Sequence, residues 1–150
     1  MPTATAVQTR IAIAEDLESL VTIGLRFARE SVYAQRLPIT EAGVRGLVQW
    51  VLAHGVIWLS MKDDHPVAVF GMTILPHMLT GQLYAAEVFW WSNPEERGHG
   101  LRLFYTAQAW AKAQGVTMMQ LVAPTPDAEQ LYARLGYTKI EAVYTKDFVC

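Results

Sequence analysis

The chain has 150 residues, of which 52% are hydrophobic and 17% charged, and its formal net charge is −2. An average domain is about 25% charged, so this composition excludes a disordered chain, and the near-neutral charge excludes the basic surface that nucleic-acid binding needs. The length suits one hydrophobic core. We therefore expect a single domain over 1–150, with a loose lead-in over 1–9.

The sequence lacks the patterns of a metal site, a membrane span and a secretion signal. Its one cysteine, Cys150, and its four histidines do not have the spacing of metal ligands. No apolar run reaches the 18 residues of a membrane span, and the first residues lack the apolar core of a signal peptide. We expect a cytoplasmic protein that binds no metal, membrane or nucleic acid.

The first half of the sequence predicts a strand, two helices and a hairpin, in that order. The expected ranges are 10–14, 15–33, 41–54, and 56–61 with 67–75. Thr40 is placed to cap the second helix, and Gly55 to end it. Gly71 interrupts the second hairpin strand and favours a bulge there.

The second half predicts a strand, a helix, a strand, a helix and a last strand or pair of strands. The expected ranges are 83–91, 101–114, 118–123, 126–135 and 137–149. The strand over 83–91 is apolar on both faces, as in a central strand, with Glu87 its only charge. Strict alternation would place Glu87 on the same face as Phe89 and Trp91. The order of elements indicates an α/β (α+β) domain with a mixed sheet covered on both faces.

The loop before the helix over 101–114 has the features of an anion site. Gly98 and Gly100 allow the backbone to turn with its N–H groups inward, and the helix start adds its dipole. Arg97 and Arg102 add charge suited to a diphosphate. Leu103 stands where a dinucleotide-binding fingerprint needs its third glycine. A plain tight turn remains the alternative for this loop.

Two motifs at family spacing resemble the GNAT family of acyl-CoA-dependent N-acyltransferases. Residues 97–102 (RGHGLR) follow the pattern Q/R-x-x-G-x-G/A except at the last position, and 125–137 are similar to N-x-x-A-x-x-L-Y-x-x-x-G-F/Y. The resemblance covers roughly 10–148, and within the family it is closest to short phage-associated members. It implies a mixed, mostly antiparallel sheet flanked by about four helices.

The resemblance implies that acetyl-CoA is the co-substrate and lies in a cleft where strand 83–91 splays from strand 118–123. The cofactor-binding residues expected from it are Trp91, Ser92, Arg97, Gly98, His99, Gly100, Leu101, Arg102 and Thr125. Two of them depart from the family pattern. Arg102 replaces a Gly or Ala, and Thr125 replaces an Asn, which keeps a helix cap but removes an amide contact to the cofactor.

Two residues are candidates for acid–base chemistry. Tyr132 matches the family tyrosine that protonates the leaving thiolate, although it also fits as a core residue. Glu87 resembles the base of some members, because a carboxylate in an apolar strand is costly unless it is used or paired; a structural ion pair is the alternative. Glu30 is a second candidate base, and with Tyr33 it is expected on the acceptor side.

The expected reaction is direct attack of an amine, on a small molecule or a protein, at the thioester of acetyl-CoA. A non-catalytic acyl-CoA-binding or regulatory module is the main alternative, and a purely structural domain is a third. Loops 34–39 and 76–82 are expected to set acceptor specificity. A homodimer is also expected. The 11% of aromatic residues are expected to build much of the wall of the cofactor cleft.

Overall fold

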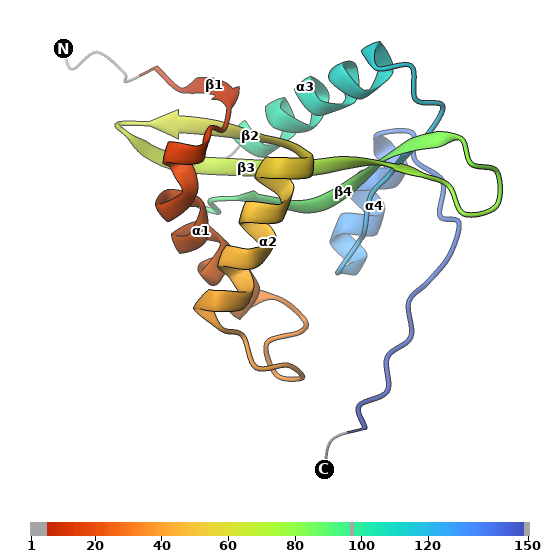
Figure 1. Ribbon diagram of the computed structural model, residues 1–150, viewed down its shortest axis with the longest axis horizontal. Helices are drawn as coiled ribbons and strands as arrows, with labels where there is room; N and C mark the ends of the chain where they lie inside the picture. The colour runs from red at the N-terminus through yellow and green to blue at the C-terminus, as the bar shows by residue number, and fades with distance from the viewer. Residues whose placement is uncertain (1–5, 97, 149–150) are drawn as a thin grey trace.

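The computed structural model describes residues 6–96 and 98–148, and a five-stranded sheet lies at its centre (Figure 1). In sheet order, which is also chain order, the strands are β1 (Gln8–Ile11), β2 (Gly55–Lys62), β3 (His65–Pro76), β4 (Leu83–Ser92) and β5 (Met119–Gln120). Neighbouring strands are antiparallel except β4 and β5, which are parallel. The predicted mixed, mostly antiparallel sheet is confirmed, although its first strand begins within the expected lead-in.

Four α-helices flank the sheet: α1 (Leu17–Glu30), α2 (Glu41–His54), α3 (His99–Ala113) and α4 (Pro126–Arg134). A short 3₁₀ turn, η1 (Ala14–Asp16), precedes α1, so the first helix starts two residues later than predicted. Thr40 accepts the Gly43 N–H at 3.0 Å and caps α2 as expected. Helix α3 begins at His99, two residues earlier than predicted.

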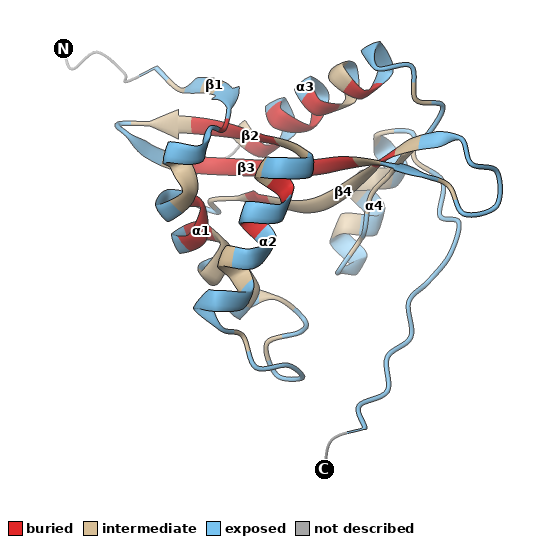
Figure 2. Ribbon diagram, viewed as in Figure 1, coloured by how far each residue is buried: buried red, intermediate tan, exposed pale blue. Residues whose placement is uncertain are grey.

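The helices bury two separate apolar clusters, one on each face of the sheet. Leu20 of α1 and Val51 of α2 pack against β2 and β3 on one face. Leu103 and Phe104 of α3 pack against Phe70 and its neighbours on the other. Figure 2 shows the buried residues gathered on β2, β3 and the inward sides of these helices. Within β4, Ala85 and Trp91 are buried and most other residues are half-buried, so the expectation of a strand covered on both faces is met only in part.

A bulge in β4 changes which side chains share a face. Gly71 pairs with Phe89 and Met72 pairs with Glu87, so Val88 is the extra residue. Phe89 packs in the α1–α2 cluster, whereas Met72 belongs to the α3 cluster. Glu87 therefore lies on the α3 face, because cross-strand partners share a face. The predicted alternation was wrong beyond the bulge. Gly71 was expected to mark a bulge in its own strand, whereas the extra residue stands in the partner strand β4.

The last predicted strands are shorter than the sequence indicates. The strand expected over 118–123 is reduced to Met119–Gln120, which pair only with Ala85 and Ala86 of β4. From Glu87 onward, β4 continues without a described strand on that side. The strand expected over 137–149 does not form in its described part, because 138–148 leave the body as an extended segment (Figure 1).

Candidate active site

A cleft of about 710 Å³ lies beside the part of β4 that has no β5 neighbour. Three elements supply its lining: the end of β4, the start of α3 and one side of α4. The lining residues are Trp90, Ser92, Gly98, Gly100, Leu101, Ala128, Leu131 and Tyr132. Its volume is in the range of about 300–1,000 Å³ found for small-molecule sites.

The start of α3 forms one end of this cleft. Gly98 precedes the helix with φ +91°, a conformation that favours glycine, and no side chain among the described residues caps the helix. The first N–H groups of a helix have no partners within it, and its dipole is positive at that end. This end of the helix has the features that an anion site needs, and the anion site itself stays a prediction. Arg97, predicted to add charge here, lies outside the described residues.

Gly100 holds the start of α3 close against β4. A Cβ at this position would lie 2.9 Å from the Ser92 Cβ and 3.2 Å from the Trp90 Nε1. The Trp90 indole N–H donates to the Gly100 carbonyl at 3.0 Å. A side chain at position 100 would therefore push the loop away from the strand.

Trp90 is the central side chain of an aromatic stack between the core and the cleft. Its ring stacks on Phe104 at 5.4 Å and on Tyr132 at 5.9 Å between centroids, with interplanar angles of 18° and 8°. The aromatic contacts continue from Trp90 to Phe70, and from Phe70 to Trp58 in the core beneath α3. Most of the aromatic excess is thus core packing, and only part of it forms the cleft wall.

Sequence reasoning assigned no cleft role to Ala128 or Leu131. It included Trp90 among the aromatic residues expected to build the cleft wall, but it did not place this side chain on the α3 face. The bulge at Val88 turns the Trp90 indole to the α3 face, and the sequence of β4 gave no sign of this extra residue. Ala128 and Leu131 precede Tyr132 by four residues and one residue on α4. Their positions within the second family motif could have indicated them.

Tyr132 and Glu87 come together beside Val122. The Tyr132 hydroxyl donates to the Val122 carbonyl at 3.0 Å. Burial raises the pKa of Glu87 to about 7, against a smaller lowering by the Val122 backbone N–H. Burial, with a smaller effect of the Glu87 charge, raises the pKa of Tyr132 well above its ordinary value. The tyrosine is thus held protonated while the carboxyl titrates near neutral pH.

Glu87 forms no ion pair with any cation among the described residues. This arrangement argues against the alternative of a structural salt bridge. Because an isolated carboxylate is costly in apolar surroundings, the charge of Glu87 lowers stability rather than supporting it. A group of this kind is typical of a functional site.

Four of the other predicted cofactor residues lie outside the lining of the cleft. The Trp91 side chain is buried on the α1–α2 face, where the Arg26 guanidinium lies 5.3 Å from the ring centroid. Arg102 is exposed on α3. Thr125 accepts the Ala128 N–H at 3.2 Å and caps α4, as expected. The His99 Nε2 lies 3.8 Å from a carboxylate oxygen of Glu96.

The two residues expected on the acceptor side are not among those that line the cleft. Glu30 is exposed at the end of α1 and pairs with Arg26 at 3.3 Å. Tyr33 is 44% exposed in the loop that follows. Nothing in the geometry makes Glu30 a base for chemistry near Tyr132, so Glu87 is the stronger candidate.

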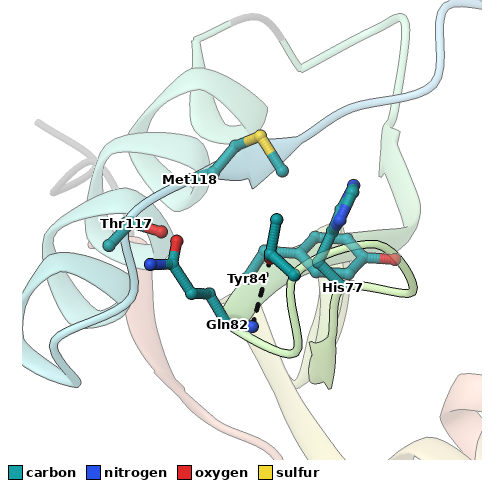
Figure 3. Close-up of a pocket in the computed structure, with 6 residues that line it drawn as sticks. His77, Gln82, Tyr84, Thr117 and Met118 are labelled. Carbon is teal, nitrogen blue, oxygen red and sulfur yellow. Dashed lines mark hydrogen bonds between the residues drawn. The ribbon is translucent and has the colours of Figure 1, made fainter.

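Loop 76–82 lines a second, smaller pocket of about 350 Å³ (Figure 3). His77 and Gln82 face it from the loop, with Tyr84 from the beginning of β4 and Met118 from the approach to β5. The His77 and Tyr84 rings meet edge to face at 5.7 Å. Because Tyr84 and Ser92 stand at opposite ends of β4, this loop borders a different site from the cleft.

Comparison with known proteins identifies the family. The model of the acetyltransferase (GNAT) family matches residues 25–137. The chain therefore belongs to this family, as its two motifs predict. Comparison with curated proteins gives no significant match.

Solved structures share the fold at low sequence identity. A GCN5-related N-acetyltransferase from Ralstonia eutropha JMP134 is 21% identical, with a TM-score of 0.73 over 94% of this chain and 98% of that one. A predicted acetyltransferase from Clostridium acetobutylicum, solved with acetyl-CoA, is 18% identical, with a TM-score of 0.73 over 95% and 96%. The aminoglycoside N-acetyltransferase AAC(6')-Iy, solved with CoA, is 17% identical, with a TM-score of 0.71 over 100% and 99%.

Two further structural facts concern the described residues alone. Within 6–96 and 98–148, every helix is too short or too polar to cross a membrane. In the same ranges, no three His, Cys, Asp or Glu side chains gather into a group that could hold a metal ion.

Proposed function

We propose that this protein transfers the acetyl group of acetyl-CoA to an amine. The observation that carries the proposal is one cleft with an uncapped helix start at one end and the Glu87–Tyr132 pair beside it. Membership of the acetyltransferase family supports it. So do two matched structures, one solved with acetyl-CoA and one with CoA.

The residues of the cleft suit the parts of acetyl-CoA. The N–H groups from Gly98 to Leu101 would bind the diphosphate, because a helix start favours negative charge. The backbone of Trp91 and Ser92 has no β5 neighbour and would pair with the pantetheine amides. Trp90 and Leu131 provide apolar walls for the arm. Arg102, exposed on the same helix, would contribute at most a peripheral charge.

The acid–base roles rest on the protonation state of each group: the Tyr132 hydroxyl carries a proton near neutral pH, and the Glu87 carboxyl can lose its own. Glu87, as carboxylate, would accept the proton of the attacking amine as the new C–N bond forms. The C–S bond then breaks, and Tyr132 would give its hydroxyl proton to the departing thiolate. A general base is most effective with a pKa near the working pH, which is where burial places Glu87.

Other expectations stay proposals of the same kind. The acceptor amine belongs to a small molecule or a protein, with Glu30 and Tyr33 on its side of the site. We further propose one domain across the chain and a cytoplasmic location. A homodimer and the resemblance to short phage-associated members also stay predictions.

The test measures thiol release from acetyl-CoA across a panel of amines, together with the melting temperature in acetyl-CoA. A ligand at 100 times its Kd stabilises a protein by about 2.7 kcal/mol. We expect both stabilisation and turnover, with turnover lost in Tyr132→Phe. Stabilisation without turnover would instead support the non-catalytic binding module, which the family match does not favour. Absence of both would overturn the proposal.

A further inference from the structure

A lysine of a distant strand contacts the loop that precedes α3. The Lys62 Nζ lies 3.0 Å from one carboxylate oxygen of Glu96 and 3.3 Å from the other, although 34 positions separate the two residues. Lys62 ends β2, and Glu96 stands two residues before Gly98. The Glu96 Oε2 also lies 3.8 Å from the His99 Nε2. This carboxylate is therefore close both to the end of β2 and to the first residue of α3.

The pair of Lys62 and Glu96 is partly enclosed. Their side chains are 35% and 27% exposed, whereas those of the Arg36–Asp147 pair are 46% and 43% exposed. Charges interact more strongly where less water surrounds them. The charge of Glu96 should therefore be felt at the start of α3, and so should the cation that balances it.

Backbone hydrogen bonds fix Glu96 in the turn that follows β4. The Asn93 N–H donates to the Val67 carbonyl at 2.8 Å, and the Glu96 N–H donates to the Asn93 carbonyl at 2.9 Å. These bonds and the Lys62 side chain connect Glu96 to the hairpin of β2 and β3. The carboxylate thus has little freedom to move away when an anion binds at the start of α3.

The segments on either side of this pair are rich in acidic residues. Glu95 precedes Glu96, and Asp63 and Asp64 follow Lys62 in the β2–β3 turn, where their φ angles are 51° and 62°. Like charges repel an approaching diphosphate over about a Debye length, roughly 10 Å at 0.1 M salt. Glu96 is the acid whose carboxylate lies beside the first residue of α3, so its charge needs a partner most.

We propose that Lys62 is a positioning residue for acetyl-CoA: it holds the Glu96 carboxylate and offsets its charge, so that the N–H groups at the start of α3 can bind the diphosphate. This inference rests on the proposed function, because it needs a diphosphate at that end of the cleft. Lys62 acts through Glu96, with its ammonium close to both carboxylate oxygens.

A purely structural link between the loop and the hairpin predicts a different result. If the pair only held the loop in place, loss of either partner would weaken cofactor binding. If the pair balances charge, the two losses have opposite signs. Without Lys62 the carboxylate repels the diphosphate, and without the Glu96 charge the free ammonium attracts it. The sign of the effect of Glu96→Gln therefore separates the two explanations.

The experiment measures the Kd of CoA by calorimetry for the parent, Lys62→Met, Glu96→Gln and the double variant. In Lys62→Met the Kd should rise roughly 10-fold, the effect of one unbalanced unit charge at about 10 Å. In Glu96→Gln the Kd should fall, and in the double variant it should return close to the parent value. Lys112→Met is the matched control, because Lys112 is an exposed cation at the far end of α3, and its Kd should not change. Thermal melting checks that each variant folds.

Two further readouts distinguish a charge effect from a structural one. The difference in Kd between Lys62→Met and the parent should shrink in about 1 M NaCl, where the Debye length is about 3 Å. In turnover, the KM for acetyl-CoA should rise in Lys62→Met while kcat stays unchanged, because Glu87 and Tyr132 are intact.

An unchanged Kd in Lys62→Met, or weaker binding in Glu96→Gln, would overturn the inference. A double variant that binds as weakly as Lys62→Met would also overturn it, since Lys62 would then act on the cofactor directly. In each of these results the parent binds CoA, so the acetyltransferase proposal stands. A parent chain that binds no CoA would overturn both.

Discussion

Replacing Glu87 by Gln should make the protein more stable and less active, with both effects set by pH. The carboxyl has a raised pKa of about 7 because it is buried, against an ordinary value of 4.5. Gln is close in shape and keeps polar atoms beside Val122, but it never carries charge. The substitution therefore removes a charge that the fold disfavours and that the proposed reaction needs.

The size and sign of the stability effect follow from the two pKa values. Below pH 4.5 the carboxyl is protonated in both the folded and unfolded chain, so its charge contributes nothing. Between 4.5 and about 7, the folded state alone keeps its proton, and stability falls as pH rises. Above pH 7 the loss is complete, at roughly 3 kcal/mol for a shift of this size. Because Gln carries no charge, the Glu87→Gln variant does not lose this stability as pH rises.

The assay compares denaturant or thermal unfolding of the parent and Glu87→Gln at pH 5 and pH 8. At pH 8 the variant should gain up to roughly 3 kcal/mol relative to its difference at pH 5, and each kcal/mol raises Tm by about 2–4 °C. Glu15→Gln is the control, because Glu15 is an exposed acid in η1 and should show no such pH-dependent gain. A variant that loses stability at pH 8 would refute the argument and point to a structural ion pair.

The same pair of variants tests the catalytic role. In the parent, kcat/KM should rise with pH through about 7 as Glu87 loses its proton. In Glu87→Gln this dependence should vanish, and the rate should fall roughly 10²–10⁴-fold, the usual contribution of a general base. Glu15→Gln shares the titration of the acceptor amine, so any difference between the two variants reports Glu87. An unchanged rate in Glu87→Gln would remove it from the mechanism.

Three further variants probe the cleft, and Gly46→Ala in α2 serves as a control. Tyr132→Phe removes the hydroxyl that donates to Val122, so kcat should fall roughly 10²-fold or more while the Kd of CoA by calorimetry stays unchanged. Gly100→Ala places a Cβ 2.9 Å from a side chain of β4 and should weaken CoA binding and lower Tm, whereas Gly46→Ala, with nothing within 4 Å, should raise stability by about 0.5–1 kcal/mol. Trp90→Leu removes the ring on which Tyr132 stacks; kcat should fall more than CoA affinity, and an unchanged kcat would show that the stack does not position the acid.

The sequence could predict the elements whose cause is local. Thr40 and Thr125 cap helices because their hydroxyls accept N–H groups three residues onward. Gly98 and Gly100 mark the loop because one needs a positive φ and the other needs space beside β4. These causes lie within a few residues of each position, so a pattern in the chain is enough to show them.

The elements that were predicted wrongly depend on residues that lie far away in the sequence. The sequence over 138–148 has the composition of a strand, but a strand also needs an edge to pair with. Within one chain these residues do not reach one. Ion pairs such as Arg36–Asp147 join residues 111 positions apart and leave no local signal.

The bulge in β4 shows both a local cause that the sequence could indicate and a consequence that it could not. Gly71 marks the place of the irregularity, but its effect on the position of Glu87 depends on the pairing of two strands. A bulge shifts the face of every residue on one side of it. If β4 alternated regularly through Val88, Glu87 would share the face of Phe89 and Trp91 and lie on the side of the α1–α2 cluster. With the bulge, Glu87 and Trp90 both lie on the face of α3 and α4, where Tyr132 stacks. One inserted residue thus brings the candidate base beside the candidate acid.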